Sequence, residues 1–333
     1  MINPIAVYTD GLILYWSAIV IALGIAACFT MSQALYTSYA GNGRALWVMF
    51  PIAVVLSVFF SRLLHWYCHT EQYAGFFKAL TDYSSGGYVL PGAILGTFLA
   101  ALLTRGLGFT DNVARLLDAV APGGALAVAF IRLSALFNSS CRGKIAVKTP
   151  FLQHLPLASP VYSSSADDYR FATFFVQFLL MLVVFVLLYN FYTKRRNRPM
   201  KGGMSRDGHA ARMFLLFYGA VELIMDSTRY DSSFLPFNGF VSVVQIISAV
   251  LVVYVLVHYS VMSVKVKGLR FSHFLMWILF AAALGGGGMC EYLVQRHGDW
   301  YLRCYAGMGL CIAILCVICW RMYSGCCAKG RTE

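Results

Sequence analysis

The chain has 333 residues, of which 59% are hydrophobic and 12% are charged, and its mean hydropathy is +0.69. A soluble domain cannot cover that much apolar side chain with polar groups, so the composition excludes a soluble globular protein and predicts a membrane-embedded one. The net charge of +12 is explained by loops that face anionic lipid headgroups, and no nucleic-acid partner is expected because no basic segment interleaved with aromatic residues is present.

Long apolar runs predict an all-α, polytopic membrane protein with about nine transmembrane helices. A helix needs about 20 apolar residues to cross a bilayer core, and helices are the default because unsatisfied backbone groups are costly in lipid. In chain order the runs are 11–36, 44–68, 87–104, 116–137, 171–193, 212–226, 239–262, 271–290 and 304–323. The sixth run is short and the fourth is weak. No small-residue cleavage pattern follows the first run, so we expect a retained helix rather than a removed signal peptide.

Loop charge predicts the orientation. Lys and Arg accumulate in cytoplasmic loops, and the densest cluster is TKRRNRPMKGGMSRDGHAAR, residues 193–212. If this loop is inside, the loops on the same side hold most of the 26 Lys and Arg residues. The N-terminus is then outside and the C-terminus cytoplasmic.

The chain divides into a membrane domain, residues 1–262, and an appended two-helix hairpin with a short cytoplasmic tail, residues 263–333. The hairpin carries four consecutive glycines at 285–288 and the expected outer turn EYLVQRHGDWYLR. We place no ionisable residue inside the membrane here, and we expect a packing or partner-contact role.

Charged residues inside the runs are the main functional signal, because such charges cost at least a few kcal/mol and mark pathways or sites. Arg62 and His65 lie on one face near the outer end of the second run. Arg132 lies near the outer end of the fourth run, and Asn138 follows at its mouth.

The sixth run adds two carboxylates and a third arginine. Glu222 and Asp226 are four residues apart and share a helix face, and Arg229 follows. An arginine near a helix end can extend its side chain to the headgroups, and this would explain Arg229 taken by itself. Three arginines from three helices at one depth instead predict a cavity for an anion such as a lipid phosphate, which the Arg fork matches.

The segment SSGGYVLPGAILG, residues 84–96, is rich in glycine. Gly92 and Gly96 form a small-xxx-small face typical of close helix packing. Gly86, Gly87 and Pro91 favour a non-helical stretch that lines a cavity.

The ten cysteines predict no metal site, because no CxxC pair has a matching His or Cys pair, and no cofactor is expected. Four cysteines would lie near the outer face: Cys68, Cys141, Cys290 and Cys304. The sequence leaves open whether a disulfide joins two of them.

The order of motifs resembles the bacterial prolipoprotein diacylglyceryl transferases over about residues 1–262. The segments that carry the resemblance are NPIAVYTDGLILYW, the Arg62 helix, GGYVLPGAILG, LLDAVAPGGALAVAFIRLSALFNSSCRGK, FLLFYGAVELIMDSTRYDSS and NGFVSVVQIISA. Arg132, Asn138 and Gly143 match the family's long signature in order and spacing.

Several positions depart from the family pattern. The family's important histidine is Pro91 here, its inner arginine of the sixth helix is Glu222, and its glutamate there is Asp226. Further departures are Ser17, Ile131, Ala135 and Ser140. The family also has seven helices, so the last two of this chain are unaccounted for.

The resemblance implies transfer of a diacylglyceryl group from phosphatidylglycerol to the lipobox cysteine of a preprolipoprotein signal peptide, in the bacterial cytoplasmic membrane. We expect Arg132 and Arg229 to hold the phosphate, Asp226 to orient Arg229 or Arg62, and Asn138 to contact the headgroup.

Other roles are less defined. Arg62, Gly92 and Gly143 are expected to line the phospholipid site, and Gly143 to permit close backbone approach. His65, Glu222 and Asp226 remain open as the base.

The sequence also raises two other functions. An inactive family member that binds phospholipid or lipoprotein signal peptides is favoured by the loss of the family histidine at Pro91. A transporter of an anionic solute is disfavoured, because its charges would span both membrane halves.

Overall fold

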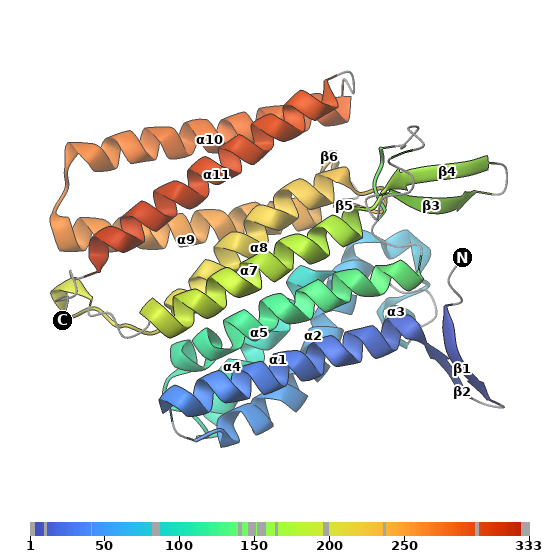
Figure 1. Cartoon of the computed structure of the whole chain (residues 1–333), viewed down its shortest axis with the longest axis horizontal. Coiled ribbons are helices and arrows are strands. Elements are labelled where there is room, and N and C mark those ends of the chain that lie inside the picture. Colours follow the sequence, from blue (N-terminus) through green and yellow to red (C-terminus); the bar gives the residue numbers. More distant parts are fainter. Residues whose placement is uncertain are drawn as a thin grey trace.

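The structure is a computed structural model of the chain that describes residues 4–9, 12–40, 42–81, 87–138, 142–145, 151, 158–163, 166–195, 200–235, 238–296 and 300–327. Long helices lie side by side along one axis, and small β-hairpins gather at one end of the bundle (Figure 1). We call this the hairpin end.

Each of the nine expected runs overlaps a long helix in the part of the chain that is described. The long helices are α1 (Trp16–Ala40), α2 (Arg44–Cys68), α4 (Leu90–Gly106), α5 (Val113–Ser134), α7 (Thr173–Arg195), α8 (His209–Thr228), α9 (Val243–Lys267), α10 (Phe271–Arg296) and α11 (Tyr301–Cys326). The short elements are α3 (Phe76–Thr81) and the 3-10 turns η1 (Thr70–Gln72), η2 (Ala135–Phe137) and η3 (Lys201–Gly203). The all-α prediction is confirmed.

Seven of the described helices are long and apolar enough to cross a bilayer, by length and composition. They are α1, α2, α5, α7, α9, α10 and α11, whereas α4 is apolar but shorter, at 17 residues. The chain is therefore a multi-pass membrane protein. Nine spans and the orientation remain predictions.

Three short hairpins were not expected from the sequence. Strand β1 (Ile5–Thr9) pairs with β2 (Leu12–Tyr15), β3 (Ala158–Ser163) with β4 (Ala166–Phe171), and β5 (Phe234–Leu235) with β6 (Asn238–Ser242), all antiparallel. Hydropathy alone does not separate a short apolar strand from the start of an apolar helix, so two predicted helices began too early.

The start of α9 shows what fixes the true boundary. The Ser242 side chain accepts a hydrogen bond from the Gln245 backbone N–H, and the Gln245 side chain accepts one from the Ser242 backbone N–H. This capping box satisfies two of the unpaired donors at the helix start. The helix therefore begins at Val243, and β6 takes the residues before it.

Helix α4 packs closely on α2, as the small-residue face predicted. A Cβ on Gly92 would lie 2.5 Å from the Phe60 carbonyl oxygen, and one on Gly96 would lie 2.5 Å from the Ser57 backbone nitrogen. Both distances are shorter than real contacts, so the two backbones approach this closely only because glycine occupies these positions.

The stretch before α4 is non-helical at residues 87–89, as expected, and Gly87 has a φ of 81° that L side chains rarely adopt. Pro91 was expected in this non-helical stretch, but it lies in the first turn of α4, where a missing N–H costs nothing. Gly86 lies outside the described residues.

The described cysteines, among them Cys68, Cys290 and Cys304, are all free thiols. The disulfide left open in the sequence is therefore not formed between these three residues, and Cys141 lies outside the described residues.

Candidate functional site

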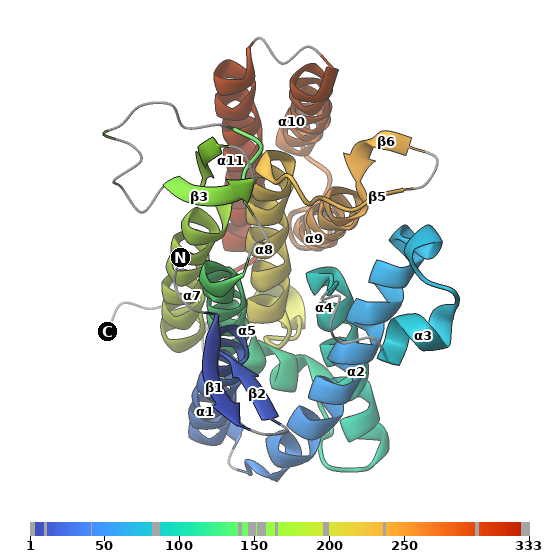
Figure 2. The same ribbon diagram turned by 90° about the vertical axis from the view of Figure 1, so that its right-hand side faces the viewer.

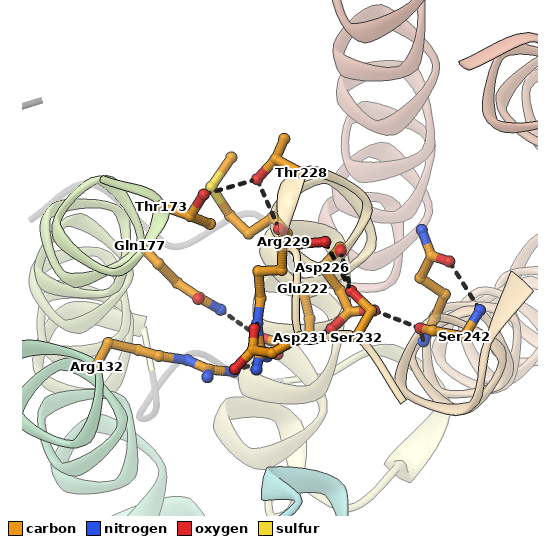
Figure 3. A network of polar contacts seen from close by, with 12 residues as sticks. Arg132, Thr173, Gln177, Glu222, Asp226, Thr228, Arg229, Asp231, Ser232 and Ser242 are labelled. Atoms are coloured by element: carbon orange, nitrogen blue, oxygen red, sulfur yellow. Dashed lines mark hydrogen bonds and ion pairs between the residues drawn. The ribbon is translucent and has the colours of Figure 1, made fainter. Parts of the chain in front are cut away.

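The centre of the site is a buried carboxylate between α5, α7 and α8. Glu222 of α8 is fully buried, and it accepts hydrogen bonds from Arg132 Nη2 of α5 and Gln177 Nε2 of α7 (Figure 3). Arg132 itself is 5% exposed. An ion pair this deep is retained only when each partner is well satisfied, because removing two charges from water costs several kcal/mol each.

One turn further along α8, a second carboxylate carries the other arginine. Asp226, which is 1% exposed, accepts a hydrogen bond from the Ser242 hydroxyl and pairs with Arg229 Nη1 at 3.4 Å. Arg229 Nε also donates to Asp231 Oδ1 at 3.0 Å. Of the two arginines that Asp226 was expected to orient, the structure gives an ion pair with Arg229.

Arg132 and Arg229 meet around the same acidic group. Both act electrostatically on the Glu222 carboxylate, and Figure 3 shows their side chains directed to one space from α5 and from the end of α8. The site therefore holds two cations from separate helices, with buried carboxylates already placed among them.

The segment that follows Cys141 fixes the end of α8. Gly143 forms an isolated antiparallel bridge with Arg229, and the Lys144 N–H donates to the Thr228 carbonyl oxygen at 2.8 Å. A Cβ on Gly143 would lie 2.8 Å from the Phe171 carbonyl oxygen, so the close approach here is to the protein's own backbone. Arg229 is thus held by main-chain pairing as well as by carboxylates.

Arg62 and His65 form a second polar group, on α2. Arg62 is 1% exposed, donates to the Gly87 carbonyl oxygen at 3.0 Å, and lies over the rings of Tyr73 and Tyr88. The ring of His65 stacks on His69 with centroids 4.4 Å apart. This group contacts Gly87, in the segment that precedes α4.

The remaining predicted residues lie at the same end of the bundle. Asn138 closes the turn after α5, where its carbonyl oxygen accepts a hydrogen bond from Arg142 Nη2 at 3.1 Å. The contact of Gly92 with Phe60 accounts for that glycine by helix packing alone. Lipid-binding roles for Asn138, Gly92 and Gly143 stay predictions.

Sequence reasoning missed several members of the network. Gln177 could have been found as the single glutamine of an apolar run, and Ser242 as the cap of α9. Glu291 was misplaced: we expected it in the outer turn, but it lies inside α10, 5% exposed. The appended hairpin does carry a buried ionisable residue.

Among the described residues, no group of three His, Cys, Asp or Glu side chains comes together in a way that could hold a metal ion. The arrangement offers two guanidinium groups in surroundings of low dielectric constant. Each guanidinium can donate hydrogen bonds to two oxygens of one anion. The chemistry that such a pair supports is the binding of a phosphate or another oxyanion.

Comparison with known proteins gives one family. A family model described as prolipoprotein diacylglyceryl transferase matches residues 4–262. A phosphatidylglycerol–prolipoprotein diacylglyceryl transferase of Clostridium novyi (strain NT) is 26% identical over 256 residues, which is 75% of this chain and 92% of that protein. One of the same description from Streptococcus pyogenes serotype M5 (strain Manfredo) is 24% identical over 257 residues, 76% of this chain and 92% of that protein.

Proposed function

Because the chain belongs to the prolipoprotein diacylglyceryl transferase family, we propose that it moves the diacylglyceryl group of phosphatidylglycerol onto the lipobox cysteine thiol of preprolipoprotein signal peptides. The thiolate forms a C–S bond as the C–O bond to phosphate breaks, and glycerol phosphate leaves. The observation that carries this proposal is the pairing of Arg132 and Arg229, from separate segments, with two neighbouring buried carboxylates of α8.

The two arginines would stabilise the negative charge that grows on the departing phosphate. Cations fixed in a water-excluded site are worth far more than the same groups in water. Without lipid, Glu222 serves as an internal counter-ion for Arg132, so the headgroup must share or displace that carboxylate. Arg132 has five N–H donors, enough to serve a phosphate on one edge and Glu222 on another.

The base that takes the thiol proton is one of three residues. A cysteine of pKa about 8.5 needs such help near neutral pH. Glu222 and Asp226 lie beside the arginines, whereas His65 lies against Gly87, near Pro91, which stands where the family has its histidine. Transfer assays on Glu222→Gln, Asp226→Asn and His65→Gln would identify the base as the variant that binds lipid but does not transfer.

We place the protein in the bacterial cytoplasmic membrane, with nine spans, the N-terminus outside and the C-terminus cytoplasmic. Arg62 and Arg132 lie in the C-terminal turns of α2 and α5, and Arg229 directly follows α8. These three helices end at the hairpin end of the bundle (Figure 1). The basic segment 193–212 includes the end of α7 and the start of α8, which lie at the opposite end of the bundle (Figure 1). In this orientation the site opens to the outer face, where signal peptides present their cysteine.

A second candidate is phospholipid or signal-peptide binding without transfer. Pro91 favours it, because a proline side chain can neither take up nor donate a proton. Glu222 also favours it, because a fixed counter-ion reduces the charge that Arg132 offers to a leaving phosphate.

One experiment separates the two functions. The protein is produced in a strain whose own transferase can be shut off, and a lipobox peptide is examined for the diacylglyceryl mass increment. The transferase proposal expects the increment in wild type and its loss in Arg132→Ala. Bound phosphatidylglycerol or bound peptide with no increment would establish the binder, and the absence of lipid binding, peptide binding and increment would exclude both.

A further inference from the structure

The α10–α11 hairpin lies beyond the residues that the family model matches, yet it packs against the site. Figure 2 shows it standing beside α8 and α9 at the edge of the bundle. Helix α11 contacts both α8 and α9, and α10 contacts β6. The hairpin is thus packed onto the element that carries Asp226 and Arg229.

Both hairpin helices bind Ser227, the residue after Asp226. Ser227 Oγ donates to Glu291 Oε2 of α10 at 2.5 Å, and the Tyr305 hydroxyl of α11 donates to the Ser227 carbonyl oxygen at 3.2 Å. Ser227 is 1% exposed. The end of α8 is therefore fixed from the side that faces the hairpin.

Glu291 also reaches the segment that pairs with Arg229. Glu291 Oε1 accepts a hydrogen bond from Gln295 Nε2 at 2.8 Å, and Gln295 Oε1 accepts one from Lys144 Nζ at 3.2 Å. Lys144 lies over the Phe234 ring, and its charge interacts with Glu291 and with Asp226 of α8. Hydrogen bonds through Glu291, Gln295 and Lys144 thus join the hairpin to a cation at the site.

Packing alone does not require a carboxylate at this position. A buried charge costs several kcal/mol unless it is compensated, and an apolar side chain of similar volume fills the same space at less cost. We infer that Glu291 is a positioning residue, which holds Lys144 as a third cation of the site beside Asp226 and Arg229. That this cation serves a phosphate headgroup rests on the function proposed above.

The sign of the expected effect follows from the surroundings of Lys144. Burial lowers the pKa of Lys144 from its ordinary value of 10.5, and the carboxylates of Glu291 and Asp226 raise it, which offsets part of that loss. The substitution Glu291→Gln removes one of the negative charges that raise the pKa of Lys144, but it keeps a side chain that can form hydrogen bonds. The pKa of Lys144 then falls, and the positive charge is lost at a lower pH than in wild type.

The first test measures Lys144 directly. The full-length protein in lipid nanodiscs is treated with acetic anhydride at a series of pH values, and acylation of Lys144 is followed by peptide mass spectrometry. We expect the pH of half-maximal rate to fall by roughly 0.5 to 1 in Glu291→Gln. The matched control is Tyr305→Phe, which removes the other hydrogen bond to Ser227 without changing any charge.

An unchanged profile in Glu291→Gln, or an equal shift in Tyr305→Phe, would overturn the inference, because the contact would then be structural only.

A second arm measures phosphatidylglycerol affinity from pH 7 to 10. Between pH 7 and 10, Glu291→Gln is expected to lose roughly three- to tenfold more of its affinity for phosphatidylglycerol than wild type loses. Lys144→Arg is expected to abolish this loss of affinity at alkaline pH. If Lys144 labelling shifts but the affinities do not, Lys144 is not part of the headgroup site. If wild type binds no phosphatidylglycerol, the proposed function fails, while the labelling result still decides whether Glu291 controls Lys144.

Discussion

A buried carboxylate with two arginine neighbours determines how this site meets an anion. The resemblance predicts that Glu222 replaces an arginine of the family pattern, so we expect the charge at the centre of the site to be opposite in sign to the family's. The arginines can be carried deep into the protein because this carboxylate and Asp226 compensate them. Under the proposed function, a lipid phosphate would therefore compete with a group of the protein for these arginines.

That competition gives a prediction for Glu222→Gln. The amide keeps the volume of the side chain, and its single oxygen can still accept from Arg132, but its NH2 group cannot accept from Gln177 and the side chain carries no charge. We expect phosphatidylglycerol affinity to rise about tenfold, which corresponds to about 1.4 kcal/mol, as measured by titration of the protein in nanodiscs. Asp207→Asn is the control, because Asp207 pairs with Arg115 in the basic-loop region. Weaker binding in Glu222→Gln would show that Glu222 helps to hold the lipid.

At the scale of elements, two different kinds of contact hold the two polar groups in place. Helix α4 approaches α2 at Gly92 and Gly96, and this contact sets the start of α4 against Arg62 and His65. The end of α8 is held instead by hydrogen bonds, from the segment 142–145 and from the hairpin. The first contact depends on small residues and the second on polar ones.

A matched pair of substitutions on α4 tests the packing. A methyl group on Gly96 would lie 2.5 Å from the α2 backbone, whereas nothing lies within 4 Å of one on Gly106. We expect Gly96→Ala to lower the free energy of unfolding by about 1–3 kcal/mol, and Gly106→Ala to leave it unchanged or raise it by up to about 1 kcal/mol. Thermal unfolding in detergent measures both. Equal effects would mean that α2 and α4 do not touch as described.

The sequence predicted elements better than the contacts between them. Hydropathy located the helices, and the spacing of Gly92 and Gly96 identified a packing face. The ion pair of Arg132 with Glu222 was not predictable, because periodicity places residues on faces but does not say which faces meet. Glu291 was misplaced because a polar turn was expected where α10 continues for six more residues, to Arg296.

At the scale of the whole molecule, chain direction and loop charge define two unlike ends. The β-hairpins and the polar groups lie at one end, and the first described strand begins there, whereas α11 finishes at the other (Figure 1). If Lys and Arg mark the cytoplasmic side, the site faces outward.

Reporter fusions test this orientation. Green fluorescent protein at the C-terminus is expected to fluoresce, because it folds in the cytoplasm, and alkaline phosphatase inserted between Ser163 and Ala166 is expected to be active outside. The reverse pattern would place the site on the cytoplasmic face and contradict both the proposed topology and access for a translocated signal peptide.

The most direct test of the central claim is phosphatidylglycerol binding to variants in which lysine replaces each arginine. Lysine keeps a positive charge beside the buried carboxylates, so the fold is retained, but it lacks the planar fork that matches phosphate. We predict that Arg132→Lys and Arg229→Lys each weaken binding by about tenfold or more. Arg115→Lys, at the start of α5 where Arg115 pairs with Asp207, is not expected to weaken it. Wild-type affinity in either site variant, with the fold intact, would contradict a shared phosphate site at Arg132 and Arg229.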